Sequence, residues 1–341
     1  NTFDESQPGH ASQKSDYEIS LGKLTFAPGE TSKTFRILIV NDNFVEGDET
    51  IDLALSNPTG TGTGLGSPST ARVTILDNDT VASTSNPIDD ANFFVRQHYL
   101  DFLDREPDAA GQAFWVNQIT SCGADANCIA VKRINVSAAF FLSIEFQNTG
   151  TLAYLANKAA FGASASGSPA AVLYGQFERD LQQLQTNLVF GTPGFDAQLE
   201  ANKQAYFTDF VARPDFVAAF PTTQTPTQYV DALFANLAIV PTATDRNTAI
   251  NEFGGAANTT DQAARARALR DVAQNAGAAT AEFNRIFVTM EYFGYLRRDP
   301  DTAGFNFWLN KLNAFGGDFI KAEMVKAFIT SSEYRQRFGA S

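Results

Sequence analysis

Histidine, cysteine, methionine and tryptophan are scarce in this chain of 341 residues, which contains two of each. The scarcity of His and Cys argues against transition-metal sites built from several His or Cys ligands and against catalysis that needs a His base. Basic residues are also few, since 25 Lys and Arg accompany 38 Asp and Glu and the net charge is −13. Phosphate backbones are bound by clustered Lys and Arg, so we expect no nucleic-acid partner. No apolar run approaches the ~18 residues of a membrane span, so we expect no membrane insertion.

The chain changes character near residue 80. Before it, alternating stretches bounded by turn residues predict strands at Lys33 to Val40, Thr50 to Ser56 and Ala71 to Leu76. From Asn92 onward, Ala, Phe and Leu recur at helical spacing, and we expect an all-α domain over residues 92–341. The small, polar residues 81–91 between the two parts predict a linker. The fold class is therefore multidomain, with a β domain over residues 1–80 and a helical domain after it.

The helical part contains an internal repeat. Phe94 to Ile119 matches Phe287 to Leu312 at a constant offset of 193, and related stretches follow at Ala139 to Phe146 and Ala327 to Tyr334. We expect full copies over residues 94–146 and 287–338 and a degenerate copy at about 209–247. Each copy carries an apolar stripe that one helix cannot bury alone, so the copies and the helices between them should pack together.

Several residues of the repeat have a structural and a functional interpretation. Asp299, Pro300 and Asp301 fit an N-cap, a first helical residue and an acid in the first turn, which accounts for Asp301 without a metal or catalytic role. Trp115 and Trp308 are expected in the core, with a sugar platform as the alternative. His98 occupies the position of Glu291 in the last copy, and we expect it on a partly exposed helix face.

The run L-x-R-x-P-D-x-A-G-x-x-F-W, followed by A-F-x-x-S-x-E-[FY], resembles the bacterial domain of unknown function 4214. This secreted helical module is similar in pattern to phycobilisome linker repeats, and the resemblance covers Asn92 to Gly339. The family has no established catalytic residues. The resemblance therefore implies an extracellular scaffolding or attachment role.

Residues 15–79, from SDYEISLGKLTF to ARVTILDND, are similar to the Calx-β domain, an immunoglobulin-like antiparallel β-sandwich found in sodium/calcium exchangers and many bacterial surface proteins. In calcium-binding members, carboxylates from loops at one end of the sandwich converge on the ion. The resemblance assigns these ligand roles to Asp16, Asp42, Glu46, Glu49, Asp77 and Asp79. Asn43 and Asn78 stand where stronger binders have acids, which implies a lower affinity for calcium. The alternative is that these acids are solvated loop residues without an ion.

The resemblance also implies two opening strands that precede Asp16 in the family, and the polar residues 1–14 are a poor match for them. We therefore expect an incomplete β-sandwich. Either the chain is a piece of a longer polypeptide, or another chain supplies the missing strands by β-augmentation, which would generate a filament if repeated head to tail.

Cys122 and Cys128 flank a five-residue loop between two predicted helices. A local disulfide is the natural interpretation for an exported chain, because a redox motif would use C-x-x-C spacing and no His lies nearby to complete a zinc site. The sequence has no G-x-S-x-G, Walker or Rossmann signature, and its Gly-rich stretch at residues 59–66 has no helix after it that would cradle phosphate. We therefore expect no enzymatic activity.

Two hypotheses of different class follow. The first is a non-enzymatic extracellular structural protein of a bacterial cell surface, in one form a filament subunit joined by β-strand complementation. The second is a calcium-dependent adhesin or carbohydrate-binding module of a larger secreted protein. The expected partners are a second copy or a neighbouring surface protein, with a glycan under the second hypothesis. An enzyme with a site among the helices has only scattered Asp and Glu in its favour.

Overall fold

The chain forms two compact units in the computed structural model, which describes residues 9–79, 85–162, 165 and 167–339. Unit 1 combines residues 1–137 with residues 327–341, and unit 2 spans residues 138–326. The last residues of the chain therefore complete the unit that contains the first ones. The predicted linker falls partly on residues 81–84, which lie outside the described residues.

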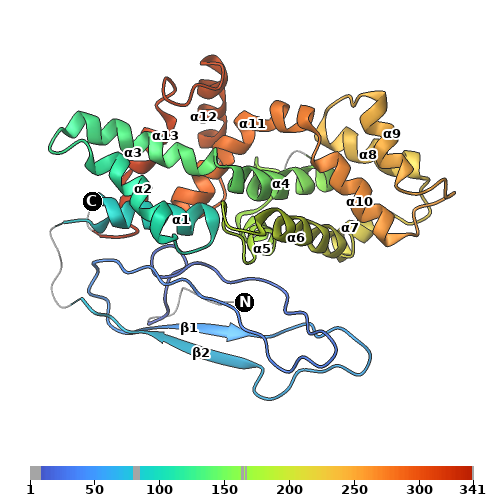
Figure 1. The fold of residues 1–341 in the computed structure, drawn as a ribbon, viewed down its shortest axis with the longest axis horizontal. Coiled ribbons are helices and arrows are strands. Elements are labelled where there is room, and N and C mark those ends of the chain that lie inside the picture. The colour runs from blue at the N-terminus through green and yellow to red at the C-terminus, as the bar shows by residue number, and fades with distance from the viewer. Residues whose placement is uncertain (1–8, 80–84, 163–164, 166, 340–341) are drawn as a thin grey trace. The chain divides into compact units, whose positions relative to one another are not determined.

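Unit 1 contains a two-stranded antiparallel sheet of β1 (Glu49–Ala54) and β2 (Thr70–Ile75), which lie side by side in Figure 1. Asp52 in β1 lies opposite Arg72 in β2, and their side chains form a bidentate ion pair with N–O distances of 2.5 and 2.8 Å. Opposite charges at directly facing positions stabilise an antiparallel pair. The strands expected near residues 50–56 and 71–76 are thus confirmed.

The small core of the β region is built on one face of β1. Ile51 is 2% exposed and packs with Ala11 and Tyr17, and the partly buried residues around this cluster are Ile37, Ile39, Leu53 and Ile75. Residues 70–74 of β2 are exposed. In the part of the chain that the structure describes, no second sheet faces this one, so the β-sandwich is incomplete.

The strand predicted from Lys33 to Val40 is wrong as a regular strand. An isolated antiparallel bridge pairs Tyr17 with Ile39, with hydrogen bonds from the amide of Glu18 to the carbonyl of Leu38 (2.7 Å) and from the amide of Val40 to the carbonyl of Asp16 (2.8 Å). Residues 33–36 are exposed. An alternating sequence forms a strand only where a neighbour pairs with its backbone along its length, and this segment has such a neighbour only at its end.

Unit 1 also contains helices. They are the 3-10 helix η1 (Pro87–Asp89), α1 (Ala91–Leu103), α2 (Ala109–Thr120), α3 (Ala126–Phe141), which continues into unit 2, and, near the end of the chain, α13 (Met324–Ile329), which starts in unit 2, and α14 (Ser332–Arg335). Asp90 caps α1 by accepting hydrogen bonds from two amides of its first turn, as short polar residues do at helix starts.

Unit 2 is helical throughout its described residues. Its other elements are α4 (Ile144–Phe161), α5 (Tyr174–Gln185), α6 (Phe195–Phe210), α7 (Pro214–Ala219), α8 (Pro226–Leu237), α9 (Ala243–Asn251), α10 (Gln262–Ala273), α11 (Ala276–Met290), the π-helical turn η2 (Glu291–Tyr295) and α12 (Thr302–Ala314). Helix α4 packs against α5, α8, α10 and α11 (Figure 1) and is buried along most of its length. Its many alanines allow this close approach on several sides.

The turn that defines the repeat has the same local structure in both copies. Asp108 caps α2 by accepting a hydrogen bond from the amide of Gly111, and Asp301 caps α12 by accepting one from Gly304, both at 2.8 Å. The N-cap predicted at Asp299 was therefore wrong by two residues. Asp301 is the N-cap because its side chain, and not that of Asp299, reaches back to the first turn.

The two tryptophans of the repeat are half-buried, and the prediction of a core position was wrong. Each packs edge to face against the preceding phenylalanine, with ring centroids 4.8 Å apart for Phe114 and Trp115 and 5.0 Å apart for Phe307 and Trp308. The two phenylalanines are 56% and 58% exposed. These helices bury a different face, on which Leu312 of α12 is fully buried. Each copy thus presents an aromatic pair at the surface.

His98 is fully buried, so the expected position on a partly exposed helix face was also wrong. Its Nδ1 lies 2.7 Å from the carbonyl oxygen of Phe94, and its Nε2 lies 2.7 Å from Oγ of Ser137. Burial lowers the pKa of His98 to about 3, so the ring is neutral. Both ring nitrogens therefore have partners, which is how a polar side chain can lie in a core.

Candidate functional site

The acidic residues predicted as ligands lie together in unit 1. All six, Asp16, Asp42, Glu46, Glu49, Asp77 and Asp79, line one cleft of about 320 Å³ beside the sheet. Three segments contribute them: the loop before residue 17, the loop that leads into β1, and the loop that follows β2. Residues 60 positions apart in the sequence are thus brought to one end of the β region.

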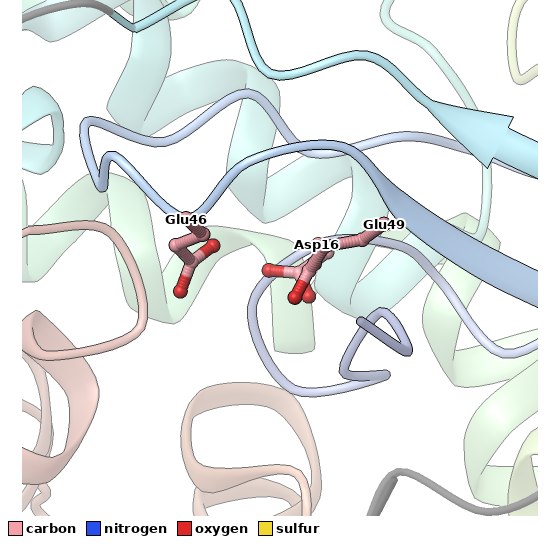
Figure 2. Close-up of side chains that lie close together, drawn as sticks. All are labelled: Asp16, Glu46 and Glu49. Carbon is pink, nitrogen blue, oxygen red and sulfur yellow. The ribbon is translucent and has the colours of Figure 1, made fainter. Parts of the chain in front are cut away.

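Asp16, Glu46 and Glu49 form the centre of this cleft, and Figure 2 shows their carboxylates directed toward a common space. Each offers one oxygen, and these three atoms lie within 4.8 Å of one another. Asp16 is only 6% exposed; its Oδ2 accepts a hydrogen bond from the amide of Ser12, whereas Oδ1 has no hydrogen-bond partner within the described part of the chain. A buried carboxylate oxygen without a donor is costly unless a cation neutralises it.

Asp77 and Asp42 shape the loops of the cleft. Oδ2 of Asp77 accepts hydrogen bonds from the amides of Glu46 (3.0 Å) and Gly47 (2.7 Å), and its Oδ1 accepts one from the amide of Asp79 (2.8 Å). These backbone donors lower the pKa of Asp77. Asp42 accepts a hydrogen bond from the amide of Phe44 at 2.8 Å. The two loops are therefore fixed to each other by Asp77 before any ion is considered.

Asp48, which is absent from the predicted ligand set, accepts a hydrogen bond at its Oδ1 from the amide of Asp77 at 3.1 Å. This bond is the reciprocal of those that Asp77 accepts, and it ties the same two loops together. Its position within the acidic run at residues 42–49 was a usable signal, because Asp side chains commonly hold such loops.

The carboxylates of the cleft raise one another's pKa values. Burial, followed by the nearby charges of Glu46, Asp16 and Asp79, raises the pKa of Asp42 to about 7. Burial and the close carboxylate of Asp16 raise the pKa of Glu49 to about 8, and burial also raises the pKa of Glu46. Like charges held this close disfavour the ionised form, and a bound cation would reverse the effect.

The donor set fits a hard divalent cation. All six predicted ligands offer carboxylate oxygen, and no His or Cys lines the cleft. Calcium takes six to eight oxygen ligands in flexible geometry, whereas softer metals select nitrogen or sulfur. The orphan oxygen of Asp16 points to the place where such an ion would bind.

The Calx-beta domain family matches residues 4–79, and the Domain of unknown function (DUF4214) matches residues 74–150 and 273–338. The chain carries a Calx-beta domain followed by two DUF4214 regions. Residues 151–272 lie between the two DUF4214 matches, so the degenerate copy predicted at about 209–247 stays a prediction.

Among curated proteins, this chain is similar to part of sodium/calcium exchanger 1 from Bos taurus, with 39% identity over an alignment of 89 residues that covers 21% of this chain and 9% of the exchanger. Sodium/calcium exchanger 2 from Homo sapiens is 41% identical over 87 residues, with the same shares. The chain thus spans about a tenth of the length of these relatives. No solved structure matches the chain significantly. No helix within the described residues is long and apolar enough to cross a membrane.

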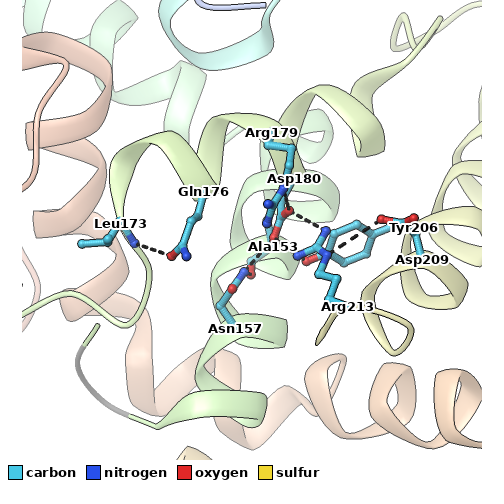
Figure 3. Close-up of polar contacts among 9 residues, drawn as sticks. All are labelled: Ala153, Asn157, Leu173, Gln176, Arg179, Asp180, Tyr206, Asp209 and Arg213. Carbon is cyan, nitrogen blue, oxygen red and sulfur yellow. Dashed lines mark hydrogen bonds and ion pairs between the residues drawn. The ribbon is translucent and has the colours of Figure 1, made fainter. Parts of the chain in front are cut away.

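A buried polar network lies between the DUF4214 regions in the sequence and is centred on one carboxylate, that of Asp180. Asp180 of α5 is fully buried and accepts hydrogen bonds from Asn157 Nδ2 (2.8 Å), Tyr206 Oη (3.1 Å) and both terminal nitrogens of Arg213 (2.7 and 3.1 Å), as Figure 3 shows. Arg179 Nε adds a further contact at 3.3 Å. With its oxygens engaged by this many donors, the carboxylate is poorly placed to act as a base. The network joins helices α4, α5 and α6.

A second cleft, which we call the amide groove, lies in unit 2 beside α12. It encloses about 760 Å³, and its lining residues are Gln147, Ala279, Thr280, Ala281, Phe283, Asn284, Arg285, Leu309, Asn313, Gly316 and Gly317. Asn284 Nδ2 donates to Asn313 Oδ1 at 2.8 Å, so two of the amides are held in place. Gln147 belongs to the first DUF4214 region and the other lining residues to the second, and together they offer amide groups and the guanidinium of Arg285.

The predicted disulfide is present: Cys122 and Cys128 are bonded, with their Cα atoms 5.6 Å apart. The bond closes the loop between α2 and α3 in the first DUF4214 region. Inside this loop, Asp125 accepts hydrogen bonds from the amides of Asn127 (3.0 Å) and Cys128 (3.1 Å), which starts α3. The second region has no cysteine, so the bond is specific to the first copy.

Proposed function

We propose that this chain is a non-enzymatic structural protein of the bacterial cell surface whose Calx-beta domain binds calcium and whose DUF4214 regions act as assembly modules. The observation that carries the calcium part is the convergence of Asp16, Glu46 and Glu49 around the orphan Oδ1 of Asp16. The similarity to part of two sodium/calcium exchangers adds support for the choice of ion.

Calcium is preferred over magnesium because of the shape of the ligand set. Six carboxylates on three loops offer many oxygens of varied direction, which suits a coordination number of six to eight. Magnesium demands near-ideal octahedral geometry and keeps several waters. We therefore expect calcium to bind more tightly than magnesium in direct competition.

Isothermal titration calorimetry of the full chain tests this part. Glu46→Gln removes one charge from the centre of the cleft and should weaken calcium binding at least about tenfold, since it costs a direct ligand. Glu30→Gln is the matched control, because Glu30 is an exposed acid of the same domain that pairs with Lys33, outside the cleft. Absence of heat in the wild type, or equal affinity in Glu46→Gln, would refute the calcium part.

The assembly part is supported by the open sheet. Within the described residues β2 pairs with β1 alone, so its outer edge offers backbone groups to another strand. Large apolar side chains in and just after β2 are exposed, with Val73 at 36% and Leu76 at 70%. A strand from a second copy would cover both the edge and these side chains, which is the arrangement of β-augmentation.

Negative-stain electron microscopy of the purified chain tests assembly. Fibres or regular oligomers are expected in the wild type, and Leu76→Lys should reduce them because a charge beside the edge opposes strand addition. Dispersed monomers at all concentrations, with and without calcium, would reject self-assembly.

A second candidate function, a carbohydrate-binding adhesin, is favoured by the surface of the second DUF4214 region. The exposed Phe307 and half-buried Trp308 form an aromatic pair of the kind on which sugar rings stack, and the amide groove is polar and nearly uncharged. Glycan-array binding that is lost in Phe307→Ala and kept in Phe315→Ala would support it, since Phe315 is similarly exposed but is not a member of the Phe307–Trp308 pair. Unchanged binding in Phe307→Ala would remove it.

A further inference from the structure

The last described residues of the chain contact the loops of the acidic cleft. Arg337 is 4% exposed and donates from Nε to the carbonyl oxygen of Lys14 at 2.8 Å, two residues before Asp16. The other side of its guanidinium forms a bidentate contact with Asp101 of α1, at 2.8 and 3.3 Å. Arg337 therefore links the Asp16 loop to α1 through one planar group, which matches the fork geometry of arginine.

Two further contacts hold the loop that carries Asp42. The amide of Asn43 donates to the carbonyl oxygen of Phe338 at 3.1 Å. Arg96 of α1 donates from Nη2 to the carbonyl oxygen of Ile39 at 3.0 Å. Both ligand loops that pack toward α1 are thus attached at the backbone, within three residues of a predicted ligand.

These contacts have a clear energetic consequence. Asp16 and Asp42 belong to loops without regular secondary structure, so their carboxylates stay near Glu46 only if the backbone is held. The segment of residues 335–339, which we call the C-terminal segment, and α1 supply that hold from outside the β region. A cation bound by carboxylates from all three loops would stabilise the same loop arrangement that docking of the C-terminal segment stabilises.

We propose that calcium binding and docking of the C-terminal segment are coupled, with Arg337 as the positioning residue of the Asp16 loop. This inference rests on the calcium site proposed above and adds a means of its regulation. Coupling is reciprocal, so calcium stabilises the docked segment and loss of docking weakens calcium binding by the same factor. Segments that lie 323 positions apart in the sequence then respond to one ion.

Calcium titrations of the full chain measure the coupling. Arg337→Gln alone leaves Asp101 buried without its ion-pair partner and threatens folding, so the test variant is Arg337→Gln with Asp101→Asn. We expect it to raise the calcium Kd at least about fivefold, within the usual range of coupling energies. The matched control is Arg246→Gln with Asp231→Asn, which removes a bidentate arginine–aspartate pair that lies in unit 2, outside the C-terminal segment. Its Kd should stay within about twofold of the wild type.

Hydrogen exchange of the wild type provides a second readout that needs no variant. Calcium should slow exchange at the amides of residues 335–339 and leave α9, which lies in unit 2, unchanged. If Arg337 had only a structural role, the test variant would be less stable but would keep the calcium Kd of the wild type. Calcium would then not slow exchange at residues 335–339 of the wild type. If the wild type binds calcium but the test variant binds equally well, or calcium gives no protection, the coupling is wrong and the calcium site stands. If the wild type binds no calcium, both proposals fail.

Discussion

Gly304 lies directly against the hydroxyl of Tyr292, so that a Cβ atom at position 304 would come within 2.3 Å of Oη. The first copy repeats this contact between Gly111 and Tyr99, at 2.2 Å. In each copy the same tyrosine ring is also covered by an arginine guanidinium, 5.2 Å from the ring centre for Arg298. The signature residues of the repeat thus build one packed turn, and their spacing is explained without catalysis.

This contact predicts that Gly304→Ala destabilises the chain by about 1–3 kcal/mol, because the new methyl group overpacks the turn. Tyr292→Phe removes the oxygen with which the new methyl group would clash. Adding Gly304→Ala to Tyr292→Phe should therefore cost much less unfolding free energy than adding it to the wild type. Gly175→Ala is the control, since nothing lies within 4 Å of its Cβ position. Urea unfolding measures all four chains. A loss in Gly304→Ala that Tyr292→Phe does not relieve would contradict the contact.

The buried His98 predicts a loss of stability in acid. Its folded pKa of about 3 lies below the unfolded value of 6.5, so the unfolded chain binds the proton first and stability falls as the pH drops below about 6.5. Between pH 7 and pH 5 the loss should be about 2 kcal/mol, at ~1.4 kcal/mol per pH unit. His98→Gln removes this titration, so the difference in unfolding free energy between the two pH values should shrink by that amount. An identical difference in both chains would show that folding does not lower the pKa of His98.

The equivalent residue of the second copy predicts the opposite slope. Glu291 is 4% exposed in the π-helical turn, and its Oε2 has no hydrogen-bond partner within the described residues. Burial raises the pKa of Glu291 well above 4.5, so the folded chain keeps the proton and stability falls as the pH rises above the unfolded value. Glu291→Gln should therefore gain stability at pH 8 relative to the wild type and little at pH 4. Unfolding curves at the two pH values measure this, and a gain of equal size at both would count against it.

The disulfide predicts a moderate cost of reduction. Cys122 and Cys128 are six residues apart. In the chain-entropy treatment, closing a loop this short lowers the entropy of the unfolded chain and stabilises the fold by about 2 kcal/mol. The variant with serine at both positions should lose that amount of unfolding free energy. Dithiothreitol should lower the unfolding free energy of the wild type and leave that of the serine variant unchanged. A reductant effect that persists in the serine variant would point to a different cause.

Much of this organisation was predictable from local sequence. The change from alternating to helical patterns placed the β region and the helices, and two of three predicted strands formed. The family resemblance placed six acidic residues, and the structure brings all of them to one cleft. The strands and helices depend on residues close in sequence, where turn chemistry and side-chain periodicity act directly, whereas the resemblance supplied the grouping of the six acids.

The rest depended on contacts between distant residues. Lys33 to Val40 alternates like a strand, but pairing along its length is absent from the described structure. The polarity of His98 favoured a surface position, but Ser137 and the carbonyl of Phe94 satisfy both ring nitrogens inside the core. Nothing near Arg337 indicates that it contacts Lys14, because the two are 323 residues apart.

The bidentate contact between Asp101 and Arg337 spans 236 positions of the chain. A polypeptide that leaves a ribosome or an export channel in order presents Asp101 long before its partner arrives. During that interval α1 carries a carboxylate whose ion-pair partner has not yet been made, so its final packing waits for residue 337. A product cut short before Arg337 would keep Asp101 without that partner and leave unit 1 incompletely packed and open to proteolysis.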